Sequence, residues 1–347
     1  MLAAVLYGKE DVRMERIPIP APAPGEVLVR IGAALTCGTD VKVFRRGYHA
    51  LMIRPPAVFG HEFAGTIERV GEGVAGFAPG DRVVAANSAP CDACFYCRRD
   101  RTELCEDLVF VNGAYAEYLV IPARIVAKNL LRVPSHLSFE EAALTEPLAC
   151  AVRGMEDSPA RKGDTVAVLG LGPIGLLFVR LCHLAGATVI AAGRRAERLT
   201  LARTLGADYV LDATGNADIP EAVRTLTEGG RGADLVVEAV GLPEVWEQAI
   251  ACARKAGCVS LFGGCPAGSA VSVDTHRIHY EELTLRGTFH HTPAAIRTAL
   301  ALIASGEVPA RDFLQSRAAL TAVPAVLASL ARGGGAVKTV IETIAQE

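Results

Sequence analysis

Short apolar runs, separated by glycine and proline, dominate the first 150 residues. Runs of this kind lie at residues 27–31, 65–70, 82–86 and 118–121. Their short length and their valine and isoleucine content are typical of β-strands, and the glycines and prolines between them indicate turns. We therefore expect residues 1–150 to form a compact, mostly β domain with long loops.

After Ser138 the pattern changes to helices and strands in alternation. Residues 139–155 carry helical periodicity, with Ser138 as a suitable N-cap before two glutamates. Strand-like segments follow at 165–169, 188–192, 209–211, 235–239 and 259–262, and helix-like segments at 173–184, 195–205, 219–227 and 244–253. Such alternation, with strands that are apolar throughout, predicts a parallel, doubly wound sheet.

These patterns predict an α/β protein in three parts. Residues 1–150 form the mostly β domain, and residues 151–289 form the doubly wound domain. Residues 290–347 contain a helix at 293–305 and then short strands. We expect this last part to fold back onto the first domain.

Composition and charge exclude several classes of function. The chain has 347 residues, which suggests two domains, and a net charge of −3, which gives no basic surface for nucleic acid or anionic membrane. The sequence shows neither a secretory signal pattern nor a transmembrane helix. Ten cysteines fit a reducing compartment, so we expect a cytoplasmic protein whose clustered thiolates bind metal.

Four cysteines lie within a short segment at 91–105. The spacing C-x2-C-x2-C-x7-C, formed by Cys91, Cys94, Cys97 and Cys105, allows one lobe to hold a tetrahedral Zn²⁺. Two disulfides or four buried thiols are the alternatives. Because disulfide frameworks suit small secreted domains, we favour a structural zinc site.

A glycine-rich segment follows the first strand of the doubly wound domain. The sequence Gly170-Leu-Gly172-Pro173-Ile174-Gly175 opens the helix at 173–184, the context in which G-x-G-x-x-G binds a dinucleotide pyrophosphate. An ordinary βα turn is the alternative. The next strand ends in Gly193-Arg194-Arg195 and lacks the carboxylate that usually binds the NAD ribose. We therefore favour NADP(H), with NAD as the alternative.

A second set of metal-binding residue types lies outside the four-cysteine lobe. Cys37, His61 and Glu146 offer a thiolate, an imidazole and a carboxylate, which suit an open zinc site with a free fourth position. Each residue alone is more often structural. Their occurrence beside a four-cysteine lobe and a dinucleotide motif favours a catalytic site.

Many motifs in the same order make the chain resemble the zinc-containing medium-chain alcohol dehydrogenases over essentially its whole length. It is most similar to the branch of sorbitol, threonine and polyol dehydrogenases. The matching segments are Cys37-Gly-Thr-Asp40, Gly60-His-Glu62, Val70-Gly-Glu-Gly-Val74, Pro79-Gly-Asp-Arg-Val83, the four-cysteine lobe, Ala114-Tyr-Ala-Glu-Tyr118, Glu146-Pro-Leu-Ala149 and Gly170–Gly175. The resemblance implies a GroES-like catalytic domain, a Rossmann domain, and dimers or tetramers.

The resemblance also implies roles for individual residues. Cys37, His61 and Glu146 bind the catalytic zinc, and Glu62 is either a ligand or a base beside it; the sequence leaves open which glutamate is the permanent ligand. Thr39 accepts the substrate proton while hydride passes to the nicotinamide. Many relatives have a histidine where this chain has Lys42, so Lys42 is either the end of the proton relay, a cofactor contact or a surface charge.

The expected activity is oxidation of a secondary alcohol, such as a polyol, sugar alcohol or amino alcohol, or the reverse reduction of a ketone. A primary or aromatic alcohol dehydrogenase, with residues 50–58 lining an apolar pocket, is the runner-up. A non-catalytic NADPH-binding protein is a third alternative, which the intact set Cys37, Thr39, His61 and Glu146 opposes. His290 and His291 are adjacent after a strand-like segment, so at most one of them is expected to face substrate.

Overall fold

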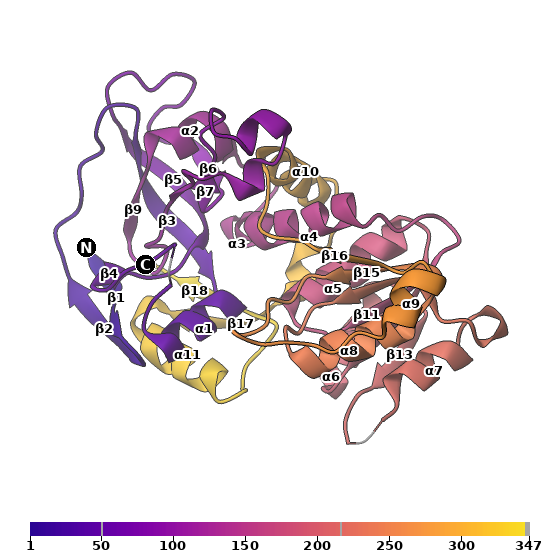
Figure 1. Cartoon of the computed structure of the whole chain (residues 1–347). Helices are drawn as coiled ribbons and strands as arrows, with labels where there is room; N and C mark the ends of the chain where they lie inside the picture. The colour runs from indigo at the N-terminus through magenta and orange to yellow at the C-terminus, as the bar shows by residue number, and fades with distance from the viewer. Residues whose placement is uncertain (50, 216, 344–347) are drawn as a thin grey trace. The chain divides into compact units, whose positions relative to one another are not determined.

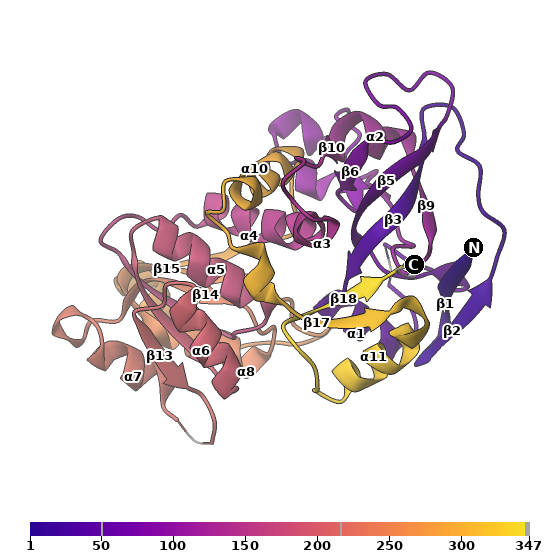
Figure 2. The same cartoon turned by 180° about the vertical axis from the view of Figure 1, so that it is seen from behind.

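The computed structural model describes residues 1–49, 51–215 and 217–343. It divides into two compact units: Met1–Ala149 with His291–Glu347, and Cys150–His290. We call them unit 1 and unit 2. Figures 1 and 2 show the elements from opposite sides.

Unit 1 is built around a mixed sheet in which β3 is central. The sheet runs β10-β6-β5-β3-β18-β17, and β9 also pairs with β3. A three-stranded sheet, β2-β1-β4, lies in the same unit. The strands are β1 (Leu2–Gly8), β2 (Asp11–Arg16), β3 (Val27–Leu35), β4 (Ala57–Val58), β5 (Glu62–Val70), β6 (Arg82–Ala85), β7 (Ser88–Ala89), β8 (Val109–Phe110), β9 (Tyr118–Ile121), β10 (Leu130–Arg132), β17 (Leu314–Ala319) and β18 (Lys338–Glu342).

The helices of unit 1 are short and follow or connect these strands. They are α1 (Gly38–Arg46), α2 (Ala123–Asn129), α3 (Phe139–Ala143), α10 (Pro293–Ala304) and α11 (Val323–Ala331), and α4 (Thr145–Asp157) crosses the boundary with unit 2. The side chains of β1, β3, β5 and α11 contribute to one apolar core, which includes the fully buried Phe59, Phe63 and Tyr115.

The C-terminal segment completes the sheet of unit 1. Strand β18 pairs antiparallel with β3 and parallel with β17. Its first residue, Lys338, is 1% exposed and donates from Nζ to both carboxylate oxygens of Glu62, at 2.6 and 2.5 Å. A buried ion pair thus joins residues 276 positions apart in the sequence.

Unit 2 is a parallel sheet with helices on both faces (Figures 1 and 2). The strand order β13-β12-β11-β14-β15-β16 is that of a doubly wound dinucleotide-binding sheet. The strands are β11 (Thr165–Leu169), β12 (Thr188–Gly193), β13 (Tyr209–Asp212), β14 (Ala233–Glu238), β15 (Ala253–Leu261) and β16 (Thr284–Gly287). The helices are α5 (Pro173–Leu184), α6 (Ala196–Thr204), α7 (Ile219–Thr225), α8 (Pro243–Cys252) and α9 (Thr275–Tyr280).

The predicted helix at 139–155 is interrupted. Ser138 caps its start, as expected, by accepting the N–H of Glu141, but the helix ends at Ala143 and a new one begins at Thr145. Pro147 explains the break, because proline lacks the N–H for the carbonyl four residues earlier and its ring clashes with that carbonyl. No described helix is long and apolar enough to cross a bilayer.

We predict that Lys338→Met strongly destabilises unit 1. Removing the ammonium leaves the carboxylate of Glu62 buried without its cation, which costs about 3–5 kcal/mol. Hydrogen–deuterium exchange at the amides of β3 and β18, in metal-free protein, measures the loss within unit 1. Lys9→Met, at an exposed lysine of the same unit, is the control, and equal exchange in both variants would contradict the prediction.

Candidate active site and metal centres

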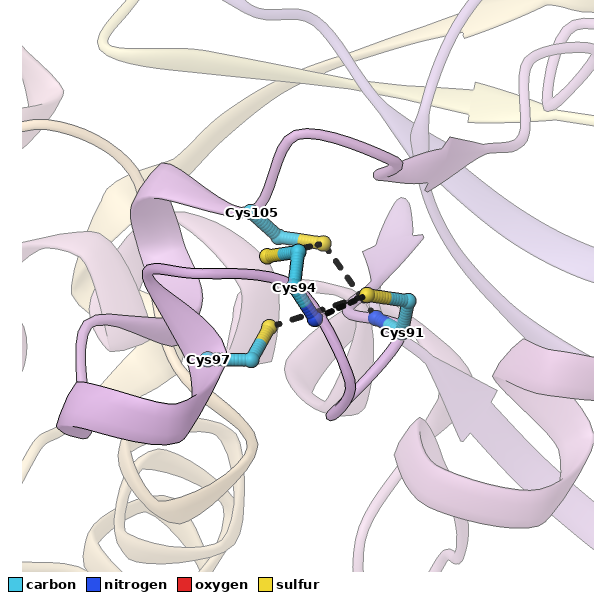
Figure 3. A group of neighbouring side chains, drawn as sticks. All are labelled: Cys91, Cys94, Cys97 and Cys105. Atoms are coloured by element: carbon cyan, nitrogen blue, oxygen red, sulfur yellow. Dashed lines mark hydrogen bonds between the residues drawn. The ribbon is translucent and has the colours of Figure 1, made fainter.

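The four cysteines of the lobe converge on one point. The Sγ atoms of Cys91, Cys94, Cys97 and Cys105 all lie within 4.8 Å of one another. Figure 3 shows the four side chains grouped together. The distance from Cys91 Sγ to Cys97 Sγ is 4.0 Å, and that from Cys94 Sγ to Cys105 Sγ is 3.9 Å. These distances exclude disulfides. A tetrahedron of thiolates around zinc has edges of roughly 3.8 Å, so the lobe fits a zinc ion.

Backbone N–H groups of this lobe donate hydrogen bonds to the cysteine sulfur atoms. Cys91 Sγ accepts the N–H groups of Ala93 and Cys94, and Cys105 Sγ accepts that of Asp107. The backbone N–H groups of Cys97 and Glu106 lower the pKa of Cys94 to about 6. These hydrogen bonds favour the thiolate of Cys94, the form that binds metal, whereas burial raises the pKa values of Cys97 and Cys105.

Cys37 and Asp40 are positioned by the start of α1. Cys37 is the N-cap of this helix: its Sγ accepts the N–H of Thr39, and its own N–H donates to the carboxylate of Asp40 in a capping box. Asp40 is fully buried and also accepts the hydroxyl of Tyr115. Its other oxygen lies 3.0 Å from Nδ1 of His61. With Nδ1 engaged by a carboxylate, Nε2 is the nitrogen of His61 available to a metal.

The second group of potential ligands consists of Cys37, His61 and Glu62. Their ligand atoms lie within 4.8 Å of one another. Burial lowers the pKa of His61, but Asp40 and Cys37 outweigh burial and raise it well above its usual value. A thiolate, an imidazole and a carboxylate are the donor types of a catalytic zinc. The residues present therefore fit this ion, with the carboxylate of Glu62 also held by Lys338.

Glu146 is buried close by but is not a member of that group. Its Oε1 lies 3.9 Å from Nε2 of His291, which also lies 2.9 Å from the side-chain oxygen of Asn87. Burial and the negative charge of Glu62 raise the pKa of Glu146 to about 7, although His61 opposes the shift. The geometry thus places Glu62, rather than Glu146, beside Cys37 and His61.

Two further predicted residues lie on α1. Thr39 is half-buried, two residues after Cys37, and Lys42 is exposed on the same helix.

The strand β16 ends at Gly287, before His290 and His291, the two predicted histidines. His291 is buried in unit 1, whereas His290 is the last residue of unit 2. Ala50, the first residue of the proposed apolar stretch 50–58, lies outside the described residues.

The glycine-rich turn of unit 2 joins β11 to α5. Gly170 has a φ of +99°, which favours glycine, and a side chain at Gly175 would place Cβ 1.8 Å from the carbonyl oxygen of Gly170. Gly172 is the N-cap of α5 without a side-chain hydrogen bond, and a Cβ there would meet only open space. The turn therefore leaves room, and free N–H groups, for a pyrophosphate.

A pocket of about 390 Å³ extends from this turn to the end of β12. Its lining includes Gly170, Gly172, Gly193, Arg194 and Arg195, all predicted to bind the cofactor. Pro173, Ile174 and Gly175 form the first turn of α5 behind it. The lining also includes Arg198, which the sequence prediction did not single out.

Sequence reasoning did not assign a structural role to three buried residues that support the candidate sites. Asp40 carries a local signal, an acidic residue three positions after the N-cap. Lys338 carries none, because its partner lies 276 residues away. Glu238, at the end of β14, is fully buried and accepts the N–H groups of Val240 and Gly241 at 2.7 and 2.8 Å. It thereby shapes a loop that lines the dinucleotide pocket.

Both units are similar to known protein families. Residues 23–134 match the alcohol dehydrogenase GroES-like domain, and residues 173–305 match the zinc-binding dehydrogenase domain. L-threonine 3-dehydrogenase of Pyrococcus furiosus is 36% identical over 87% of this chain and 86% of its own. Sorbitol dehydrogenase of Bombyx mori is 32% identical over 98% and 97%.

A solved structure shows the same similarity in three dimensions. A protein of Sinorhizobium meliloti, described as a zinc-binding dehydrogenase bound to NADP, superposes with a TM-score of 0.91 at 32% identity and covers 98% of both chains. Two family models in the expected order, relatives matched over nearly their full length, and this superposition agree with one another. The chain belongs to the zinc-dependent alcohol and polyol dehydrogenases, with a GroES-like domain and a Rossmann-like domain.

Proposed function

We propose that this protein transfers a hydride between NADP(H) and a secondary alcohol or ketone, with a polyol, a sugar alcohol or an amino alcohol as substrate. The observation that carries the proposal is the group formed by the half-buried Cys37 and the buried His61 and Glu62, in a chain whose second unit has a pocket beside the glycine-rich turn. The threonine and sorbitol dehydrogenases among its relatives support this substrate class. A panel of polyols, amino alcohols and simple primary alcohols tests it.

Two zinc sites are part of the proposal. Cys37, His61 and Glu62 hold the catalytic ion, with Glu146 as a ligand in exchange, and the four cysteines of the lobe hold a structural ion. When bound, zinc supplies a Lewis acid for the substrate oxygen and the nicotinamide supplies the hydride acceptor. Asp40 orients His61, and Thr39 takes the substrate proton.

We also propose the preferred cofactor, the cellular location and the assembly of the protein. The absence of a carboxylate at the end of β12 and the arginines Arg194 and Arg195 support NADP(H) over NAD(H). The family and the reduced cysteines support a cytoplasmic homo-oligomer, a dimer or a tetramer, without nucleic-acid or membrane partners.

We expect Cys37→Ser to abolish turnover while leaving NADPH binding measurable. A hydroxyl is a poor zinc ligand, so kcat should fall by about 10³-fold or more. Steady-state kinetics and titration of NADPH fluorescence measure the two properties separately. Cys258→Ser, at a half-buried cysteine of unit 2, should retain turnover; full activity of the Cys37 variant would refute the metal assignment.

Cys94→Ala should remove one zinc per chain and destabilise unit 1 without changing the chemistry of the other site. Losing a metal that cross-links four loop positions should lower the melting temperature by about 5 °C or more. Elemental analysis and thermal melting, with and without a chelator, measure both effects. Unchanged zinc content and an unchanged melting curve would count against a structural ion.

The double variant Arg194→Ala and Arg195→Ala should raise KM for NADP⁺ about 10- to 100-fold, since charged hydrogen bonds to the 2′-phosphate are lost. KM for NAD⁺ should change little. Steady-state kinetics with both cofactors, at fixed ionic strength, measure the difference. Equal changes for NADP⁺ and NAD⁺ would rule out recognition of the 2′-phosphate by these arginines.

A further inference from the structure

A second pocket of unit 2 lies at the opposite end of the parallel strands from the dinucleotide pocket. Its volume is about 330 Å³, and its lining includes Ala253, the first residue of β15, which pairs with Ala233, the first residue of β14. The dinucleotide pocket is instead lined by Ala239, which follows the end of β14. Since β14 spans six residues at about 3.3 Å per residue, roughly 20 Å of strand separates the two pockets.

The lining of the second pocket is rich in cations, and we call it the basic pocket. Of the described residues that line it, four are cationic: Arg224 in α7, Arg231 in the loop before β14, Lys255 in β15 and Arg277 in α9. One, Glu281, is acidic. Because the four cations belong to different elements, the fold of unit 2, rather than a local run of basic residues, brings them together.

Two of the guanidinium groups are held in place by the C-terminal end of α8. Arg277 donates from Nη1 to the carbonyl of Ile250 and from Nη2 to that of Ala253, both at 2.8 Å. Arg224 donates from Nη1 to the carbonyl of Ala251 at 3.4 Å. Cations are favourable at the C-terminus of a helix, where the carbonyl groups lack partners within the helix. These contacts fix the positions of both guanidinium groups in the wall of the basic pocket.

The same guanidinium groups keep donors that the protein does not use. Arg277 pairs with Glu281 at 2.8 Å, and Arg224 pairs with Glu221 at 2.9 Å. A guanidinium carries five N–H groups, so the bonds to one carboxylate and to the carbonyls of α8 leave N–H groups on each arginine for a ligand.

Arg231 and Lys255 are compensated more weakly. Arg231 lies 3.7 Å from the carboxylate of Glu228, but the two side chains are 63% and 97% exposed, so water weakens this pair. Among the residues that the structure describes, no carboxylate forms an ion pair with Lys255. The hydrogen bond from Arg277 lowers the pKa of Glu281, and Lys255 lowers it further. The ammonium of Lys255 therefore acts on a side chain of the pocket lining.

We propose that the basic pocket is a second anion site, which binds a phosphoryl group of either free phosphate or a small phosphate monoester. A phosphate dianion presents three strong acceptor oxygens, so it can bond to several of these cations at once, whereas a carboxylate presents two oxygens and one charge. The arginines fixed by α8 supply directed donors, and Lys255 supplies a mobile charge. The site does not depend on the proposed hydride transfer, because it lies at the other end of the strands.

Isothermal titration calorimetry on the full-length protein tests the site. The protein is first saturated with NADPH, or with NADH if that binds more tightly, so that the dinucleotide pocket is occupied. The probes are inorganic phosphate and phenyl phosphate. Lys255→Met and Arg231→Met should each weaken the binding of both probes about 10-fold, since each variant removes charged hydrogen bonds.

Matched controls separate binding at this pocket from a general effect of charge. Lys162→Met and Arg203→Met change exposed residues of the same unit that lie outside the lining, and should leave the affinity for both probes unchanged. Neither Lys255 nor Arg231 caps α8, and the fluorescence of the single tryptophan, Trp246 in unit 2, reports whether each variant is folded.

The outcomes identify the ligand or overturn the site. Tighter binding of phenyl phosphate supports a monoester as ligand, and tighter binding of inorganic phosphate supports the free ion. If neither probe binds the saturated protein, or if the control variants weaken binding as much as Lys255→Met does, the inference is overturned. Turnover and affinity for NADPH should be unchanged in Lys255→Met, so this result is independent of the proposed function.

Discussion

The ion pair between Lys338 and Glu62 is the constraint on which the active-site half of this protein depends. Both side chains are almost completely buried, and each ion alone would cost several kcal/mol to desolvate. Strand β18 must therefore dock beside β3 for Glu62 to remain charged within the group that it forms with Cys37 and His61. The pairing of β18 with β3 thus also supplies the cation that faces Glu62, a candidate metal ligand.

The need to compensate a buried charge also explains the arrangement around His61. Asp40 accepts the N–H of Cys37 and the hydroxyl of Tyr115, and its other oxygen lies 3.0 Å from Nδ1 of His61, so one carboxylate contacts a helix start, a core tyrosine and the imidazole. The residue is fully buried, and its negative charge is acceptable there because these donors surround it. Asp40 therefore connects the backbone of Cys37 with the imidazole of His61.

The sequence predicted most features that are encoded locally and missed those that depend on contacts between distant residues. The segments 165–169 and 173–184 coincide with β11 and α5, because strand hydrophobicity, the glycine turn and Pro173 at the helix start all lie within twenty residues of one another. The four-cysteine lobe and the capping serine Ser138 are local in the same sense. Lys338 carries no such signal, since only the complete sheet brings it to Glu62. The choice between Glu62 and Glu146 was open for the same reason.

Charged side chains are paired differently in the candidate metal site of unit 1 and in the dinucleotide pocket of unit 2. In unit 1 the buried ions are compensated within the protein: Lys338 by Glu62, and His61 by Asp40. In unit 2 the half-buried Arg198 lies near Arg195, which lowers its pKa, and the exposed Glu197 opposes that shift. Internal compensation stabilises a fold, whereas like charges in a pocket favour a ligand of opposite charge. The paired ions of unit 1 therefore contribute to the stability of its fold, and the arginines of unit 2 make its dinucleotide pocket suitable for an anionic ligand.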